Sequence, residues 1–321
     1  MGAGIFSKLL GSLEAVGGII PDKRRSGGNL TYQLLDAIKS AFVVFFFQHP
    51  SLLDFQRAMK KRKKRNNVQT LFGAVKIPSD NQIRTLLDGI DPGLLGQAFA
   101  ENVRIAEEHK ALGPYRVLDG GVLLALDGMW HYSSQEIHCE HCLHRTHEGK
   151  TTYYHSAVAA AIVRPGSTSV IPVMAEPIMN SDGQEKQDCE LKAGKRWLSA
   201  HGEEYQWLGI TLLGDDLYSN QPFCEMVIEK KMCFIFTCKP ASHKWLIETV
   251  ENSFLEEKVA KQWTGRSNQI STYRWINGVP LRDSTDALMV NYLNSPPQQR
   301  ISSSRIVRAA SSRDCSAAKA M

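Results

Sequence analysis

The chain has 321 residues, of which 43% are hydrophobic and 22% are charged, with a formal net charge of +5 at pH 7. This length allows two domains, and the composition is that of an ordinary soluble globular protein. The most apolar stretch, residues 41–47, is cut short by Gln48, His49 and Pro50, which excludes a membrane span there. The seven cysteines show no disulfide framework spacing, so we expect a cytoplasmic protein.

The first 115 residues carry helical patterns and are expected to form an all-helical, DNA-binding region. Ser51 and Ser79 are good N-caps for helices over residues 52–59 and 79–87. The apolar residues 41–47 are expected to be buried in the core of this region. A further helix begins near Asp91 and carries one apolar stripe.

A run of six cations interrupts this helical region. Such runs are usually solvated linkers, and they are also the usual electrostatic footprint of proteins that bind phosphate backbones. Arg84, on a short capped helix nearby, is compatible with DNA contact. A helical packing domain with a solvated loop explains the composition equally well. The six cations are Lys60, Lys61, Arg62, Lys63, Lys64 and Arg65.

Strand patterns replace the helical ones from residue 116. Pro172 lies in the third predicted strand and cannot donate a ladder hydrogen bond, so that strand is expected at a sheet edge. The order predicts an α/β domain with a mixed five-stranded sheet of RNase H-like type, in which the first and fourth strands are neighbours. The predicted elements are strands at 122–126, 151–163 and 168–174, a helix at 185–200, a strand at 208–213, a helix at 222–231 and a strand at 232–238.

Two of these strands are apolar runs that lead into aspartates. Residues 122–126 run into Asp127 and Gly128, and residues 208–214 run into Asp215 and Asp216. A carboxylate beside a core is costly unless a cation meets it. One isolated aspartate would merely begin a turn, but two on neighbouring strands predict a shared metal site.

These features together resemble the DDE transposases of bacterial insertion sequences, over roughly residues 50–293. Asp215 with Tyr218 fits the family pattern Asp-x-x-Tyr/Phe, so Asp215 is favoured and Asp216 is the alternate. The stretches that carry the resemblance are 126–128, 214–219 and 273–275, with the general character of 77–82, 187–190 and 195–197.

The resemblance implies a defined chemistry. Asp127 and Asp215 would hold Mg²⁺ or Mn²⁺ and cleave double-stranded DNA at transposon ends, and the free 3′-hydroxyl would then attack target DNA. It also implies a homo-oligomer on DNA, no membrane, and a place in the bacterial cytoplasm with the nucleoid.

The third acidic residue of the family is missing from its expected place. The family has a glutamate on a helix after the fifth strand and, often, a strand-rich insertion, which would here span 254–293. No glutamate follows Glu257, and residues 294–321 are an irregular tail rich in Ser, Arg, Ala and Gln. We therefore expect a truncated or frame-shifted copy that is inactive or partial. The alternatives are a non-catalytic DNA-binding regulator or inhibitor, and another RNase H-like nuclease.

Other charged residues have two interpretations. Lys239 and Arg274 could grip DNA or face solvent, and Glu190, on a helix with several lysines, is expected on a solvated face.

Six of the ten histidines lie between residues 131 and 155. Within this stretch Cys139 and Cys142, followed by His147 and His155, could form a Cys₂His₂ zinc site on the hairpin that joins the first two strands. The alternative is an exposed polar hairpin with solvated histidines.

Overall fold

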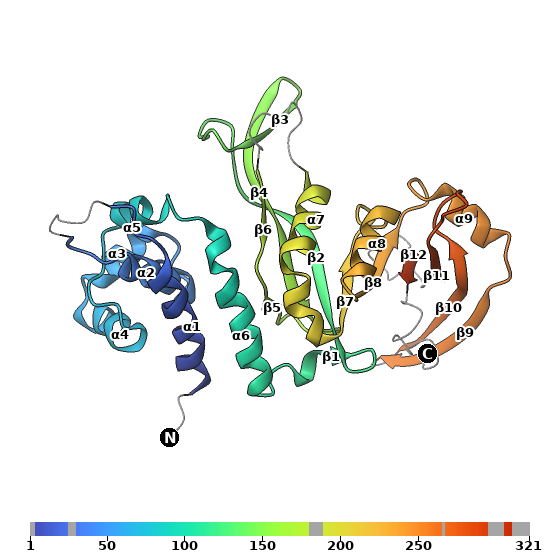
Figure 1. Cartoon of the computed structure of the whole chain (residues 1–321), viewed down its shortest axis with the longest axis horizontal. Helices are drawn as coiled ribbons and strands as arrows, with labels where there is room; N and C mark the ends of the chain where they lie inside the picture. Colours follow the sequence, from blue (N-terminus) through green and yellow to red (C-terminus); the bar gives the residue numbers. More distant parts are fainter. Residues whose placement is uncertain (1–3, 25–29, 180–188, 265–266, 295–304, 310–321) are drawn as a thin grey trace. The chain divides into compact units, whose positions relative to one another are not determined.

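The computed structural model describes residues 4–24, 30–179, 189–264, 267–294 and 305–309 (Figure 1). The chain divides into two compact units, residues 1–111 and residues 112–321. In its described part, no helix is both long and apolar enough to cross a membrane.

The described part of the first unit is built from helices. Ser51 accepts a hydrogen bond from the amide of Asp54, and Ser79 forms a capping box with Gln82, so both predicted N-caps are confirmed. The core gathers Val43, Phe55, Val68 and other buried side chains. The helices are α1 (Ile5–Ile19), α2 (Leu34–Phe46), α3 (Leu52–Met59), α4 (Arg62–Phe72), α5 (Asp80–Leu87), η1 (Pro92–Leu95) and α6 (Gly96–Glu108).

The expectation that residues 41–47 are buried is wrong for four of the seven, which are exposed. Val43 and Val44 are in the core, but Phe45 is 80% exposed and Phe46 is 49% exposed. The physical reason is helical periodicity: consecutive apolar residues on α2 and its end spread over all sides of the helix, and only one side meets the core.

The run of six cations is not simply a linker. Lys61 is the N-cap of α4, and the four following cations occupy the first turn of that helix, with every one of the six exposed. No acidic residue lies in this first turn. Cations are unfavourable at a helix N-terminus, so the packing of α4 does not account for their presence.

The second unit is a mixed α/β structure, which confirms the predicted fold class at this level. Strand order in its sheet is β3-β4-β2-β7-β8-β12-β11-β10-β9, with β1 pairing to β2 and both β5 and β6 pairing to β4. The strands are β1 (Arg116–Val117), β2 (Gly121–Ser134), β3 (Leu143–His147), β4 (Lys150–Val163), β5 (Ile171–Pro172), β6 (Glu176–Ile178), β7 (Ile210–Gly214), β8 (Cys233–Cys238), β9 (Glu256–Thr264), β10 (Ser267–Pro280), β11 (Met289–Asn294) and β12 (Arg305–Ala309).

The centre of the sheet joins antiparallel and parallel pairs. β2 runs antiparallel to β4 and parallel to β7, and β7 runs parallel to β8. Leu124, Leu212 and Phe234 are fully buried on these three strands. Helices cover the sheet, as Figure 1 shows for α7 and α8. The helices are η2 (Gly113–Tyr115), α7 (Glu190–His201), η3 (Glu203–Leu208), α8 (Gln221–Glu229) and α9 (Lys244–Glu251).

Three predicted elements differ in detail. β2 does not end at Asp127 but continues to Ser134, because β4 pairs with it along this whole length. The third strand is split into β5 and β6, which pair only with β4, as expected for an edge position at Pro172. The predicted tail contains β12, which pairs with β8 and β11. Residues 180–188, 295–304 and 310–321 lie outside the described part, including the start of the predicted helix 185–200.

Candidate functional site

Asp127 on β2 and Asp215 directly after β7 follow the end of the same parallel strand pair. The last paired residues of β2 and β7 are Ala125 and Leu213, and each aspartate follows two positions later. Neighbouring strands are about 4.8 Å apart, so this register keeps the two backbones close. Both aspartates are exposed. They are therefore placed together where the parallel pair ends, as the sequence predicted.

Asp216 has a different role from its neighbour. One of its carboxylate oxygens accepts from the amide of Lys239, and the other accepts from the hydroxyl of Ser242 at 2.6 Å. Its carboxylate thus ties the turn after β7 to the loop after β8. Asp215 makes a local bond to the amide of Leu217, at 2.9 Å. Because both oxygens of Asp216 are occupied by this loop, Asp215 is the better metal ligand of the two.

A third carboxylate reaches the same place from α7. Glu190 is the first residue of that helix, and its Oε1 accepts from the amide of Gly128 at 3.1 Å and from the hydroxyl of Tyr218 at 3.0 Å. Gly128 follows Asp127 on β2, and Tyr218 follows Asp215 in the turn after β7. Glu190 is therefore bonded to a neighbour of each aspartate.

Electrostatic coupling joins the three acids. Burial raises the pKa of Glu190, and the charges of Asp215 and Asp127 raise it further, while the bonds from Tyr218 and Gly128 oppose this. Burial beside Glu190 likewise raises the pKa of Tyr218, so its hydroxyl stays protonated and donates. A carboxyl group with like charges nearby is a candidate functional residue, because a cation would relieve the repulsion.

Glycines make room for this arrangement. A Cβ on Gly128 would overlap the carboxylate of Glu190. A Cβ on Gly194 would lie 2.7 Å from the Tyr218 ring, and a Cβ on Gly214 would lie 2.8 Å from it. The glycine after Asp127 is thus required by the close approach of the α7 carboxylate.

The expectation that Glu190 belongs to a solvated face is wrong. Its side chain is half-buried and bonded within the site. The sequence did contain a signal: Glu190 lies three, four and seven residues before Ala193, Gly194 and Trp197, which are all buried. These spacings put Glu190 on the apolar stripe of α7, facing the sheet.

No model of a known protein family matches the chain, and no curated protein matches it.

A second cluster lies near the loop between β2 and β3. Cys139 Sγ, Cys142 Sγ and His155 Nε2 all lie within 4.8 Å of one another, and in the described part of the chain they are the one such group of His, Cys, Asp or Glu. This cluster could hold a metal ion. The oxygens of Asp127, Asp215 and Glu190 are more widely spread than this.

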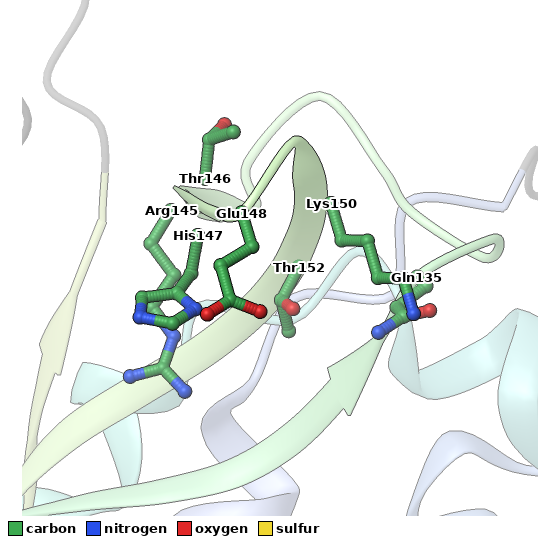
Figure 2. A pocket seen from close by; sticks show the side chains of 7 residues that line it. All are labelled: Gln135, Arg145, Thr146, His147, Glu148, Lys150 and Thr152. Atoms are coloured by element: carbon green, nitrogen blue, oxygen red, sulfur yellow. The ribbon is translucent and has the colours of Figure 1, made fainter.

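His147, the fourth predicted zinc ligand, is not brought to this cluster. Leu143 at the start of β3 pairs with Tyr154, next to His155, while His147 at the other end pairs with Lys150. Four residues of strand separate His147 from that level, or roughly 14 Å. Instead it lines a hollow near the β3–β4 turn (Figure 2). The lining residues are Gln135, Arg145, Thr146, His147, Glu148, Lys150 and Thr152.

The predicted DNA contacts fall in both units. The cations of α4 and Arg84 are exposed on the first unit. Lys239 is exposed after β8, and Arg274 on β10 forms an ion pair with Glu257 at 2.7 Å. His243 is bonded to Ser219 at 2.6 Å and lies 3.4 Å from Asp216, so it supports the loop after β8.

Proposed function

We propose that the second unit is a metal-dependent DNA-cleaving domain of the DDE transposase type, built on an RNase H-like sheet. The single observation that carries this is the convergence of Glu190 with Asp127 and Asp215. A carboxylate from a helix is bonded to Gly128 beside one aspartate and to Tyr218 beside the other. A carboxylate whose pKa is raised by burial and also by the charges of two more acids favours a cation-binding role over a structural one.

The strand arrangement supports the RNase H-like assignment. A central strand, β2, has an antiparallel neighbour, β4, and a parallel neighbour, β7, and β8 follows in parallel. The acids come from β2 and from the turn after β7, with the third from the helix that precedes β7. This is an arrangement in which elements far apart in sequence contribute to one site.

The donor set fits Mg²⁺ or Mn²⁺. Both ions prefer carboxylate and water oxygens, and Asp127, Asp215 and Glu190 offer only such donors. When bound, such ions stabilise the charge on the attacking and leaving oxygens of a phosphodiester. Since the oxygens of the three carboxylates do not all lie within 4.8 Å of one another, the exposed side chains of the two aspartates would have to rotate to hold one ion.

The remaining residues of the site hold these carboxylates in position. Tyr218 and the amide of Gly128 orient the Glu190 carboxylate through its Oε1. Asp216 fixes the loop that carries Lys239 by accepting from its amide. Lys239 is exposed on that loop, and we propose that it contacts a DNA phosphate.

Glu190 also changes the expected activity of this chain. The expectation of a defective copy rested on the absence of a glutamate after Glu257. Glu190 provides a third carboxylate from a different element, so we propose an active DNA-nicking centre. Strand transfer into target DNA is proposed as the accompanying reaction.

A second function, DNA binding without cleavage, is favoured by one observation. The six exposed cations at the start of α4 have no acidic residue in the first helical turn to balance them. A phosphate backbone would supply that balance.

Nicking of supercoiled plasmid DNA separates the two functions. The purified full chain is incubated with Mg²⁺, with Ca²⁺ in place of Mg²⁺, and with EDTA. We expect nicks with Mg²⁺ and none with EDTA, and loss of nicking in Asp127→Asn and Asp215→Asn. Asp119→Asn, on an exposed turn, is the matched control and should nick normally. DNA binding by a wild-type chain that never nicks would favour the non-catalytic function.

A further inference from the structure

We propose that Cys139, Cys142, His155 and His131 bind one Zn²⁺ ion, which fastens the loop of residues 135–142 to β4. This site is distinct from the three carboxylates and does not rest on the DNA-cleaving function. Three of the four side chains already converge: the two sulfurs are 3.8 Å apart, and Nε2 of His155 lies 3.3 Å from one and 3.4 Å from the other.

These separations match tetrahedral zinc. With Zn–S bonds of about 2.3 Å and Zn–N bonds of about 2.0 Å, a tetrahedral ion holds two sulfurs about 3.8 Å apart and a sulfur about 3.5 Å from a nitrogen. The sulfur separation here is 3.8 Å. A disulfide would require about 2.05 Å between the sulfurs and would give His155 no role. Two thiolates with an imidazole are a donor set that favours zinc over Mg²⁺ or Ca²⁺.

Hydrogen bonds to Tyr132 and Ser134 and the stacking of His138 on Tyr153 hold this loop, but apolar burial does not. Every residue from Gln135 to His141 is exposed, and Ile137 is 72% exposed, so the loop buries no apolar side chain before Cys142. Ordering such a segment costs conformational entropy that apolar burial does not offset here. A metal ion that joins Cys139 and Cys142 to His155 of β4 would supply the missing stabilisation.

A β-bulge directs His131 toward the same place. Trp130 pairs with Ser156 and Tyr132 pairs with His155, so His131 is the extra residue on β2. In a regular strand His131 would point away from the face of Tyr132. Instead both rings lie beside His155, with centroids 5.8 Å from it for His131 and 5.7 Å for Tyr132. Bulges re-aim side chains in this way, and a rotation of the His131 ring would complete the fourth position.

The other nearby histidines are less suitable as the fourth ligand. His141 lies in the turn between the two cysteines, is 62% exposed, and lies 3.5 Å from Glu140. His138 stacks on Tyr153 with ring centroids 4.2 Å apart. His131 alone among these three is adjacent to the His155 ring on the facing strand.

Metal content and cobalt spectroscopy test this site. The full chain is purified under reducing conditions, and zinc is measured by mass spectrometry. We expect about one zinc per chain, with at least a tenfold loss in Cys142→Ser and in His155→Gln. His147→Gln is the matched control from the same hairpin and should keep its zinc. A wild-type chain without zinc that also fails to bind added Zn²⁺ would overturn the proposal.

Co²⁺ substitution identifies the fourth ligand. The wild-type chain should show the intense visible absorption of tetrahedral cobalt with two thiolates. His131→Gln should change the intensity and position of these bands, whereas His141→Gln should leave them unchanged. The reverse pattern would assign the fourth position to His141 and contradict the role of the bulge. Circular dichroism of each variant establishes that it is folded.

Discussion

The hydroxyl of Tyr218 donates a hydrogen bond to Oε1 of Glu190 over 3.0 Å, although 28 residues separate the two in sequence. The tyrosine ring is fully buried, with Gly194 and Gly214 leaving space for it. Tyr218 therefore links the turn that carries Asp215 to the helix that carries Glu190. In this account its contribution is to position a carboxylate.

Tyr218→Phe should impair the site while leaving the fold intact. The ring keeps its packing, but Glu190 loses one of its two hydrogen-bond donors. We expect the free energy of unfolding to fall by about 1 kcal/mol. We expect the rate of DNA nicking to fall by about tenfold. Tyr205→Phe is the control, because Tyr205 is also a buried tyrosine and its hydroxyl makes no hydrogen bond to Glu190. Equal nicking by Tyr218→Phe and the wild type would refute the positioning role.

Gly128→Ala should displace the Glu190 side chain. The added Cβ would overlap its carboxylate, so either the side chain or the backbone of β2 must shift. Overpacking of this kind costs about 1–3 kcal/mol, measured by chemical denaturation. We also expect loss of Mg²⁺-dependent nicking. Gly113→Ala is the control, since a Cβ there would meet nothing within 4 Å. Full activity of Gly128→Ala would show that Glu190 is not needed where it lies.

Glu190→Gln should change how stability depends on pH in the metal-free protein. The pKa of Glu190 is raised in the folded state, so the folded state favours its protonated form. Its contribution to stability is therefore fully present below the unfolded pKa and is lost as the pH rises through the folded pKa. Glutamine does not titrate but can still accept from Tyr218.

Denaturation of both proteins between about pH 4 and pH 7, in EDTA, measures this difference. We expect the wild type to lose stability relative to Glu190→Gln as the pH rises, so that the variant is at least as stable at neutral pH. A difference that stays constant, or one that favours the wild type increasingly with pH, would contradict the raised pKa.

Substitutions of the two adjacent aspartates, Asp215 and Asp216, should differ in their effects on stability and on nicking. Asp216→Ala removes acceptors for Lys239 and Ser242, and we expect it to lower the free energy of unfolding by about 1–3 kcal/mol. Asp215→Ala loses a local bond to Leu217, and we expect a smaller loss of stability but a complete loss of nicking. Denaturation and nicking are measured on both variants. Greater destabilisation by Asp215→Ala would reverse the two roles.

The cations of α4 should bind DNA, and they should also lower the stability of the helix that carries them. Replacing Lys63 and Lys64 with glutamine should weaken DNA binding and reduce the slope of log K against log salt by about 0.9 for each lost phosphate contact. It should also stabilise the first unit slightly, because cations oppose the helix dipole at this end. Arg104→Gln, exposed on α6, is the control. An unchanged salt slope would remove α4 from the DNA-binding surface.

Local patterns were sufficient to predict much of the second unit. The apolar runs before Asp127 and Asp215 predicted two strands, and the structure places these strands side by side. They could be predicted because a strand buried on both faces is recognised by a continuous apolar run in its own sequence. The extension of β2 to Ser134 was missed because these residues are stabilised by β4, a partner that local sequence does not reveal.

The third carboxylate was missed for a related reason. Glu190 has lysines around it in sequence, and charge composition suggested a solvated face. Its position on the buried stripe with Gly194 and Trp197 was the better signal, because helical spacing decides which side chains meet the sheet. The proposed fourth ligand, His131 in place of His147, depends on a bulge, and pairing register cannot be read from residue spacing alone.

Mn²⁺ binding by electron paramagnetic resonance tests the central claim most directly, that Asp127, Asp215 and Glu190 form one cation site. The protein is first saturated with Zn²⁺ so that the cysteine cluster does not contribute. We predict that the wild type binds Mn²⁺ and that Glu190→Gln weakens this binding at least tenfold, as do Asp127→Asn and Asp215→Asn, while Mg²⁺ competes for the site. Wild-type affinity in Glu190→Gln, alongside loss in the aspartate variants, would contradict the account.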